Sequence, residues 1–444
     1  EYEKAAENYL IAYEMDRDDI FTLTELGWVN NAMEKYDDAI EFLLKAEKLG
    51  RNDEWINTEI ATNLGRSGKT SEGIERLHKS LAMVSEEDIK QKIFINSEIA
   101  WLYGRLEEPQ PEEALKYLNI AKELGREDEW IYSQIGYQLG YNPDKSEEAL
   151  EYFEKAIELG REDAWIFEMV ACALFNLDRY EEALKYLERL EELGQDDSWT
   201  NTEFGFCLSR LKRYEEAIER LNRALEADDD EDKDVAFIYA RLGWCKRKLN
   251  MYDEAIEDFN QAKKWGRNDA WINDEIGHCY KKKGDMKKAL EFYLIAEKDN
   301  KKDPYLMSDI AWIYDGLGQY EEGLKYIKKA VKLGRDDAWL NEEYGACLAG
   351  LDRYEEAIEK YKYALNLDDE EKDEAYIYSQ LGWCYRQLED YEKALEYALI
   401  AYELDRDDIR SLSQVGWFYD YMEKYEDGLP FLLRAEELGR DDEW

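Results

Sequence analysis

Residues 271–298, WINDEIGHCYKKKGDMKKALEFYLIAEK, carry two apolar patterns on either side of a short turn, KKGD. In both halves, large apolar or small residues recur three and four positions apart: Ile272, Ile276, Cys279 and Tyr280 around Gly277, and then Ala289, Tyr293 and Ala296. This spacing predicts an amphipathic helix on each side of the turn. Gly277 and Ala289 are small enough to let the two helices approach closely.

The same pattern recurs along the whole chain of 444 residues. A Gly or Ala aligns with Gly277 at residues 27, 61, 100, 136, 171, 205, 243, 311, 345, 382 and 416. Such regular spacing predicts an array of about twelve helical pairs, preceded by one further second helix at the start of the chain. We number each repeat so that this small residue is position 8. A lone pair cannot bury its apolar face, so the pairs must stack on one another.

Glycines and aspartates mark where the helices should end and begin. The second helix commonly stops at a Gly, which can adopt the left-handed conformation of a helix end: Gly50, Gly125, Gly160, Gly194, Gly266, Gly334 and Gly439. Asp163, Asp269 and Asp337 are expected to cap the first helices that follow.

This pattern resembles the tetratricopeptide repeat, W-x2-L-G-x2-Y followed by A-x3-F and A. Ile276-Gly277, Tyr280, Ala289, Tyr293 and Ala296 match it in the stretch above, and the match recurs over essentially the whole chain. Two positions depart from the pattern: Trp stands six residues before the Gly instead of four, and the usual junction Pro is Arg. The resemblance implies an all-α fold, a right-handed superhelical solenoid of helix pairs whose first helices line a concave groove.

Each repeat has one Trp, at position 2 or at position 9 of its first helix, and both positions lie opposite the predicted core. These candidate groove residues are Trp55, Trp130, Trp165, Trp199, Trp271 and Trp339 at position 2, and Trp28, Trp101, Trp244, Trp312, Trp383 and Trp417 at position 9. Their indole rings could bind Lys or Arg side chains of a partner, at about 0.5–2 kcal/mol each. They could equally pack against the neighbouring first helix and only shape the superhelix.

Position 6, between the two Trp positions, is often acidic. The candidate groove acids are Glu59, Glu98, Glu203, Glu275, Asp309 and Glu343. Together with the tryptophans they predict an acidic, aromatic-lined groove.

The chain has 105 Asp and Glu against 59 Lys and Arg, a formal net charge of -46. This charge argues against nucleic acid or an anionic membrane as a partner and favours a basic protein or peptide. Much of the acid also lies in helix first turns, such as YEEA and RDDAW, where it stabilises the helix without any partner.

Five of the six cysteines, Cys207, Cys245, Cys279, Cys347 and Cys384, lie at position 10, too far apart for disulfides if the helices stack about 9–10 Å apart. They indicate a reducing, cytoplasmic compartment. Neither His78 nor His278 lies in a metal or triad arrangement, and the glycines form no phosphate-binding motif. We therefore expect no catalytic activity, no metal and no cofactor.

Taken together, these features favour a protein-protein interaction scaffold, one solenoid over residues 1–444 that binds a protein segment. Two alternatives stay open: a sensor or spacer arm of a larger multidomain protein, and a self-assembling structural solenoid. The sequence starts without an initiator Met, inside a second helix, and stops at GRDDEW, where a first helix should open, so it looks like a piece of a longer chain. Residues expected to be partly uncovered at the two ends, and open to end-to-end association, are Tyr9, Leu10, Tyr13, Phe431 and Leu432.

Overall fold

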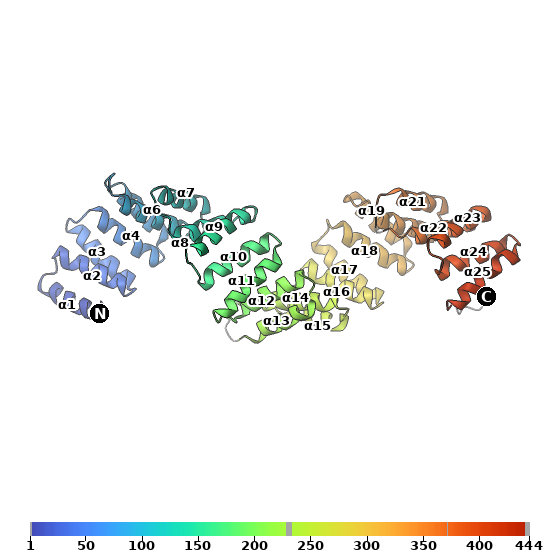
Figure 1. The fold of residues 1–444 in the computed structure, drawn as a ribbon, viewed down its shortest axis with the longest axis horizontal. Helices are drawn as coiled ribbons and strands as arrows, with labels where there is room; N and C mark the ends of the chain where they lie inside the picture. Colours follow the sequence, from blue (N-terminus) through green and yellow to red (C-terminus); the bar gives the residue numbers. More distant parts are fainter. Residues whose placement is uncertain (1, 228–232, 371, 440–444) are drawn as a thin grey trace. The chain divides into compact units, whose positions relative to one another are not determined.

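The computed structural model describes residues 2–227, 233–370 and 372–439, and within them every regular element is a helix (Figure 1). The chain divides into two compact bodies, an N-terminal body of residues 1–230 and a C-terminal body of residues 231–444. That both belong to one continuous solenoid stays a prediction. None of the described helices is long and apolar enough to span a membrane.

The N-terminal body contains a leading helix and six helix pairs among its described residues. Its helices are α1 (Tyr2–Met15), α2 (Ile20–Ala32), α3 (Tyr36–Lys48), α4 (Glu54–Arg66), α5 (Thr70–Leu81), α6 (Ile89–Tyr103), α7 (Pro111–Glu123), α8 (Glu129–Leu139), a short 3-10 turn η1 (Pro143–Lys145), α9 (Ser146–Glu158), α10 (Ala164–Asn176), α11 (Tyr180–Glu192), α12 (Ser198–Arg210) and α13 (Tyr214–Glu226). Even-numbered helices are the first helices of their repeats.

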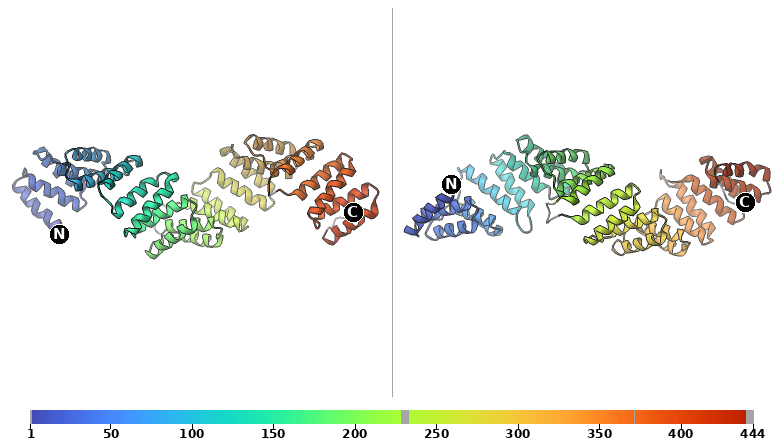
Figure 2. Two further views of the ribbon diagram at one scale, coloured as in Figure 1. Left: turned by 45° about the horizontal axis from the view of Figure 1, so that its top comes forward. Right: turned by 90° about the horizontal axis from the view of Figure 1, so that it is seen from below.

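The C-terminal body contains six more pairs among the residues that are described. Its helices are α14 (Val235–Lys248), α15 (Tyr252–Lys264), α16 (Ala270–Lys282), α17 (Met286–Asp299), α18 (Pro304–Gly316), α19 (Tyr320–Lys332), α20 (Ala338–Gly350), α21 (Tyr354–Asn366), α22 (Glu374–Gln387), α23 (Tyr391–Leu404), α24 (Ile409–Tyr421) and α25 (Tyr425–Glu437). Within each body, a first helix packs against its own second helix, and that second helix packs against the next first helix, as the two views of Figure 2 show.

An aspartate caps every first helix of the described chain, because its carboxylate accepts a backbone N–H that has no partner within the helix. The predicted caps Asp163, Asp269 and Asp337 are confirmed. The same role belongs to Asp19, Asp53, Asp88, Asp128, Asp197, Asp234, Asp303, Asp373 and Asp408. The predicted glycine ends are confirmed as well, since all seven have a positive φ between 85° and 111°.

The predicted close approach inside each pair is also confirmed. A Cβ built on Gly277 would lie 2.6 Å from the ring of Tyr293, and one on Gly345 would lie 2.7 Å from the ring of Tyr361. Both tyrosine side chains are completely buried, as is the Ala that opens the second helix, for example Ala289. The five cysteines at position 10 are buried in the same layer as free thiols.

The two ends of the described chain expose part of their apolar surface, as expected. Leu10 on α1 is 44% exposed, and Tyr9, Tyr13, Phe431 and Leu432 are half-buried. The first helix expected to open at the end of the sequence falls on residues 440–444, which lie outside the described residues.

Candidate binding face and its pocket

The twelve repeat tryptophans lie at positions seven residues apart and therefore share one face of the first helices, which we call the tryptophan face. Trp28 and Trp199 are exposed, at 44% and 37%, and the other ten are half-buried. No Trp of this set belongs to the buried core. Whether these side chains bind a partner stays a prediction, but the structure defines what already contacts them.

An arginine of the same chain covers most of the position 2 rings. In five of the six repeats the arginine stands four residues before the Trp, and its guanidinium carbon lies 4.0–5.1 Å from the ring centroid. The pairs are Arg51–Trp55, Arg126–Trp130, Arg161–Trp165, Arg267–Trp271 and Arg335–Trp339. At this distance a guanidinium stacks on an indole as a cation–π pair.

The same arginine also binds the aspartate that caps the next first helix. Its Nε lies 2.6–3.2 Å from a carboxylate oxygen of the Asp two residues later. In two repeats the guanidinium reaches further and donates to a Ser at position 5 of the preceding first helix, Arg161 to Ser133 and Arg335 to Ser308. We call this Arg-x-Asp-x-Trp arrangement the junction clasp. It links the two departures from the family pattern, because in these five repeats the displaced Trp contacts the Arg that replaces the junction Pro.

One position 2 repeat lacks the clasp arginine, since Gln195 stands four residues before Trp199. Trp199 is also the one exposed position 2 Trp among the described residues. The repeat therefore offers a natural comparison with its neighbour at Arg161.

Arg161→Gln is expected to destabilise the protein by roughly 1 kcal/mol, because it removes a cation–π contact and a partly exposed ion pair. Gln195→Arg is expected to stabilise it by a similar amount. Urea unfolding followed by helical circular dichroism measures both changes. Identical unfolding of both variants and the unmodified protein would mean that the clasp contributes nothing to stability.

Cations of the chain also cover several position 9 rings. Arg105 lies 4.3 Å from the ring centroid of Trp101, Lys281 lies 4.3 Å from that of Trp312, and Lys248 lies 5.5 Å from that of Trp244. At least eight of the twelve rings thus hold a cation of this chain within the described residues. A partner cation would have to use the remaining ring surface, so the indoles are partly structural.

The acids at position 6 are more buried than an open acidic groove would require. Glu275 and Glu343 are 6% and 8% exposed, and Glu59, Glu98, Glu203 and Asp309 are half-buried. Burial raises the pKa of Glu59 and that of Glu98. Partner binding by these acids stays a prediction, and their charge is partly suppressed or neutralised within the chain.

In three repeats the partner of this acid is the side chain at position 12 of the preceding first helix. Arg247 pairs with Glu275, Lys281 pairs with Asp309 at 2.8 Å, and Asn31 donates to Glu59 at 3.4 Å. The corresponding pair between α18 and α20 is different, because position 12 of α18 holds an acid, Asp315, which faces Glu343. Burial, together with the charges of Asp315 and Glu342, raises the pKa of Glu343 to about 8.

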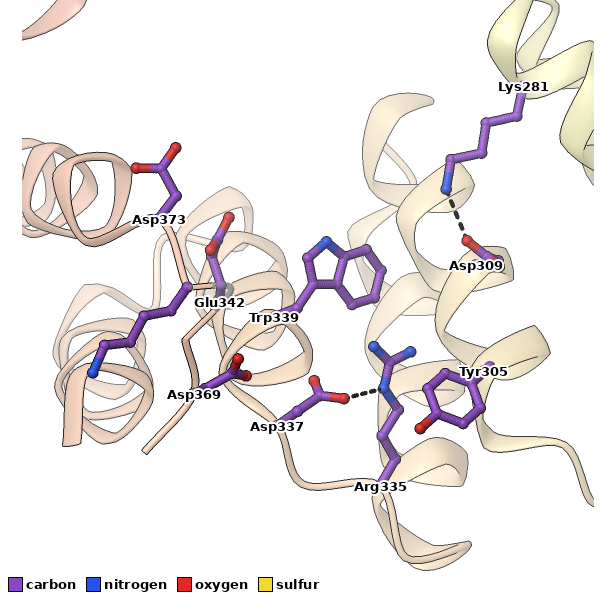
Figure 3. A pocket seen from close by; sticks show the side chains of 10 residues that line it. Lys281, Tyr305, Asp309, Arg335, Asp337, Trp339, Glu342, Asp369 and Asp373 are labelled. Atoms are coloured by element: carbon purple, nitrogen blue, oxygen red, sulfur yellow. Dashed lines mark hydrogen bonds and ion pairs between the residues drawn. The ribbon is translucent and has the colours of Figure 1, made fainter. Parts of the chain in front are cut away.

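A pocket of about 580 Å³ opens on the tryptophan face of the C-terminal body. It spans three successive first helices, α16, α18 and α20, and the junctions before α20 and α22, the second of which ends at Asp373, the N-cap of α22. Its lining residues are Lys281, Tyr305, Asp309, Arg335, Asp337, Trp339, Glu342, Asp369, Lys372 and Asp373. Figure 3 shows Trp339 between the Lys281–Asp309 pair on one side and the carboxylates of Glu342 and Asp373 on the other.

The three cations of the pocket are all bound within the chain. Lys281 pairs with Asp309, Arg335 pairs with Asp337, and the Lys372 Nζ donates to the carbonyl oxygens of Leu365 and Leu367 at 2.9 Å. The Glu342 carboxylate, by contrast, has no hydrogen bond or ion pair within the described ranges. Burial, and secondarily the charge of Asp373, raises its pKa to about 7.

Glu342 was not among the residues predicted from the sequence, although a signal was present. It occupies position 5, which holds Ser, Thr or Ala in nine of the twelve repeats. The three exceptions are Glu168, Asp274 and Glu342, and burial raises the pKa of each of these carboxyl groups. An acid at a position otherwise reserved for small residues was thus the marker of an unusual environment.

The structure also places two carboxylates beside His278, which sequence spacing did not indicate. The Asp274 and Asp309 carboxylates lie 3.7 Å and 3.5 Å from its two ring nitrogens. His78, on α5, lies against Tyr117, with 5.6 Å between ring centroids. No group of three or more His, Cys, Asp or Glu that could hold a metal ion occurs in the described part of the chain.

Comparison with known proteins agrees with this architecture. Two family models, both described as tetratricopeptide repeat, match the chain. One matches residues 196–264 and 335–407, and the other matches residues 166–196, 272–296 and 306–337. No curated protein sequence matches the chain significantly.

Three similar solved structures illustrate the range of matches. The Cut9–Hcn1 hetero-tetramer of the APC/C is 15% identical, with 99% of this chain and 91% of that chain covered and a TM-score of 0.44. A tetratricopeptide repeat protein from Parabacteroides merdae is 14% identical, with coverages of 55% and 94% and a TM-score of 0.45. A human IFIT1 dimer with PPP-AAAA is 18% identical, with coverages of 92% and 95% and a TM-score of 0.41. These similarities carry no argument about ligands. From its repeat sequence, its family matches and its tandem helix pairs, the chain belongs to the tetratricopeptide repeat family.

Proposed function

We propose that the chain is a non-catalytic scaffold that binds a basic, extended segment of another protein on its tryptophan face. The pocket around Trp339 is the observation that carries this proposal. Its lining residues come from three successive first helices and the two junctions before α20 and α22, a length that suits an extended segment better than a compact ligand. Its lining has five carboxylates and three cations, and the cations are already bound within the chain.

The indole and carboxylate groups of the pocket suit Lys and Arg side chains. Aromatic rings supply large rigid contact area, and they attract cations at their faces. The acidic charge of the whole chain would also accelerate the approach of a basic partner. This support concerns the C-terminal body, where the carboxylate excess and the pocket coincide.

Titration of the full chain with peptides, followed by tryptophan fluorescence, tests the proposal. An alternating Arg–Ser peptide is expected to change the fluorescence in a saturable way, and added salt should weaken its binding. An alternating Glu–Ser peptide is the matched control and is expected to cause no change. An equal response to both peptides would contradict the proposal.

Self-association is a second candidate, favoured by apolar side chains exposed on α1 and α25. Leu10 and Ile11 are 44% and 58% exposed, and Leu429 and Leu433 are 55% and 50% exposed. Exposed apolar faces of this kind promote association. Sedimentation velocity over a hundredfold concentration range should then show a rising sedimentation coefficient, whereas a constant monomer value would exclude this candidate.

We also propose that the protein acts in a reducing, cytoplasmic compartment. All six cysteines are free thiols, and the five at position 10 are completely buried. Burial raises the pKa of these thiols, for Cys245, Cys279 and Cys384 to about 12, so they are unreactive as nucleophiles at neutral pH. Their placement fits packing residues better than redox groups.

A further inference from the structure

We propose that the pocket around Trp339 is a receptor site for one arginine side chain of the partner, with Glu342 as the carboxylate that binds its guanidinium. This inference rests on the proposed function, because it specifies which partner side chain enters the pocket and which residue selects it. Three features of the site support it: an internal guanidinium is missing, an acceptor has no partner among the described residues, and binding must displace a proton.

The first feature is the missing guanidinium beside position 5. In two other repeats the position 5 side chain accepts a hydrogen bond from a clasp arginine of the following junction, Ser133 from Arg161 and Ser308 from Arg335. Glu342 occupies position 5 on α20, but the junction that follows it, residues 367–373 (LDDEEKD), contains no arginine. Its single cation, Lys372, is bound to the carbonyl groups of Leu365 and Leu367 and to Glu374. Within the described residues, no guanidinium donates to Glu342 as Arg161 and Arg335 donate to the two serines.

The second feature is the pair of carboxylate acceptors beside position 5 of α20, Glu342 and Asp373. The Glu342 carboxylate has no hydrogen-bond or ion-pair partner within the described part of the chain. Asp373 uses Oδ1 to cap α22, at 3.0 Å from the Tyr376 N–H, which leaves Oδ2 available as a second acceptor. In Figure 3 both carboxylates lie on the same side of the Trp339 indole, with Glu342 between the indole and Asp373. A planar guanidinium can bind carboxylate oxygens with two parallel N–H groups while its flat face stacks on an aromatic ring, whereas an ammonium group has neither the parallel pair of donors nor a flat face.

The third feature is the protonation state of Glu342. Its surroundings hold acids from several elements: Asp373 before α22, Glu343 on α20, and the phenols of Tyr361 and Tyr376. Arg410 on α24 is the one cation among the described residues that acts on its pKa. With a pKa of about 7, Glu342 is protonated in a large fraction of molecules at neutral pH. An arginine side chain would favour the ionised form, so its binding should release protons and strengthen as pH rises.

Calorimetric titration of the full chain tests this inference, with an alternating Arg–Ser peptide as the probe. Between pH 6 and pH 8 the affinity is expected to rise roughly tenfold, because an acid with a pKa near 7 ionises over this range. The heat measured in two buffers of different ionisation enthalpy should reveal proton release. The same peptide with citrulline, the neutral analogue, in place of Arg should lose this binding, and a Lys–Ser peptide should bind more weakly than Arg–Ser.

Glu342→Gln is expected to weaken Arg–Ser binding about tenfold at pH 8 and to remove its pH dependence. Glu168→Gln is the matched control, since Glu168 occupies position 5 on α10 and lies outside the pocket. This control removes the same charge and should leave the affinity and its pH profile nearly unchanged. Basic peptides that bind Glu342→Gln as they bind the unmodified chain would overturn this inference while the proposed function stands. If no basic peptide bound the unmodified chain, the proposed function itself would fail.

Discussion

Replacing Gly277 by Leu is expected to lower the stability of the C-terminal body by roughly 3 kcal/mol or more. Even a bare Cβ at this residue would lie 2.6 Å from the ring of Tyr293, whose side chain is completely buried and has no room to move. The larger side chain must therefore push α16 and α17 apart and expose the apolar layer between them. Thermal unfolding followed by circular dichroism at 222 nm measures the loss.

Gly316 is the control position, because it is also a helical glycine but has open space beside it. The two positions are compared with the same substitution, Gly277→Ala and Gly316→Ala. A Cβ on Gly316, the last residue of α18, would meet only the Met286 Cε, at 3.9 Å. This variant should be neutral or more stable by up to about 1 kcal/mol, because Ala favours helix more than Gly does. If Gly277→Ala and Gly316→Ala had the same effect, the close approach at Gly277 would not be a constraint on sequence.

Glu343→Gln is expected to stabilise the protein by a few kcal/mol at pH 8 and hardly at all at pH 4. Burial raises the pKa of Glu343 from 4.5 to about 8, so the folded state keeps a proton that the unfolded chain has released. Folding stability therefore falls as pH rises from about 4.5 to about 8, by up to 1.4 kcal/mol for each pH unit, and the loss is complete above pH 8. Gln stays neutral at every pH and escapes this loss. The difference in unfolding free energy between variant and unmodified protein, measured in urea from pH 4 to pH 9, should follow this curve.

Glu25→Gln is a suitable control, because Glu25 holds the same position 6 on α2 and accepts a hydrogen bond from the Tyr9 hydroxyl at 3.1 Å. We expect no comparable gain in stability from this change. A pH-independent effect of Glu343→Gln would show that the carboxyl ionises as easily in the folded chain as in the unfolded one.

The repeat architecture could be predicted from the sequence because its determinants are local. Gly277, Ala289 and Tyr293 stand within one helix pair, and Asp269 and Gly266 stand within one junction. Each of these residues acts on neighbours a few positions away in sequence, so spacing alone determines their geometry. The tryptophan face followed from the helical periodicity for the same reason.

The junction clasp could be predicted only in part. Arg335 and Trp339 were each recognised as departures from the family pattern, but separately. Their connection depends on a side-chain conformation that places the guanidinium against the ring and the Asp337 carboxylate together. Their constant separation of four positions was the available signal.

The pocket could not be predicted from the sequence because its residues come from three helices and two junctions. Lys281 and Asp373 are 92 residues apart in sequence, and no periodicity within one repeat relates them. The ionisation of Glu343 also depends on Asp315 in the preceding repeat, which only the stacking of α18 on α20 brings near. The sequence identified the acid, but we assigned it a charge that burial and, secondarily, its acidic neighbours suppress.

This dependence on neighbours means that the repeats are not interchangeable parts. The side chains at position 12 of α14, α16 and α18 each face the acid at position 6 of the next first helix, so the ionisation of these acids depends on the order of the repeats. If the repeat of α18 and α19 were deleted, Lys281 of α16 would face Glu343 in place of Asp315. The Glu343 carboxyl group would then ionise and form an ion pair with Lys281. Recombination within such a gene would therefore create or abolish a proton-sensitive group without changing a single codon of the repeats that remain.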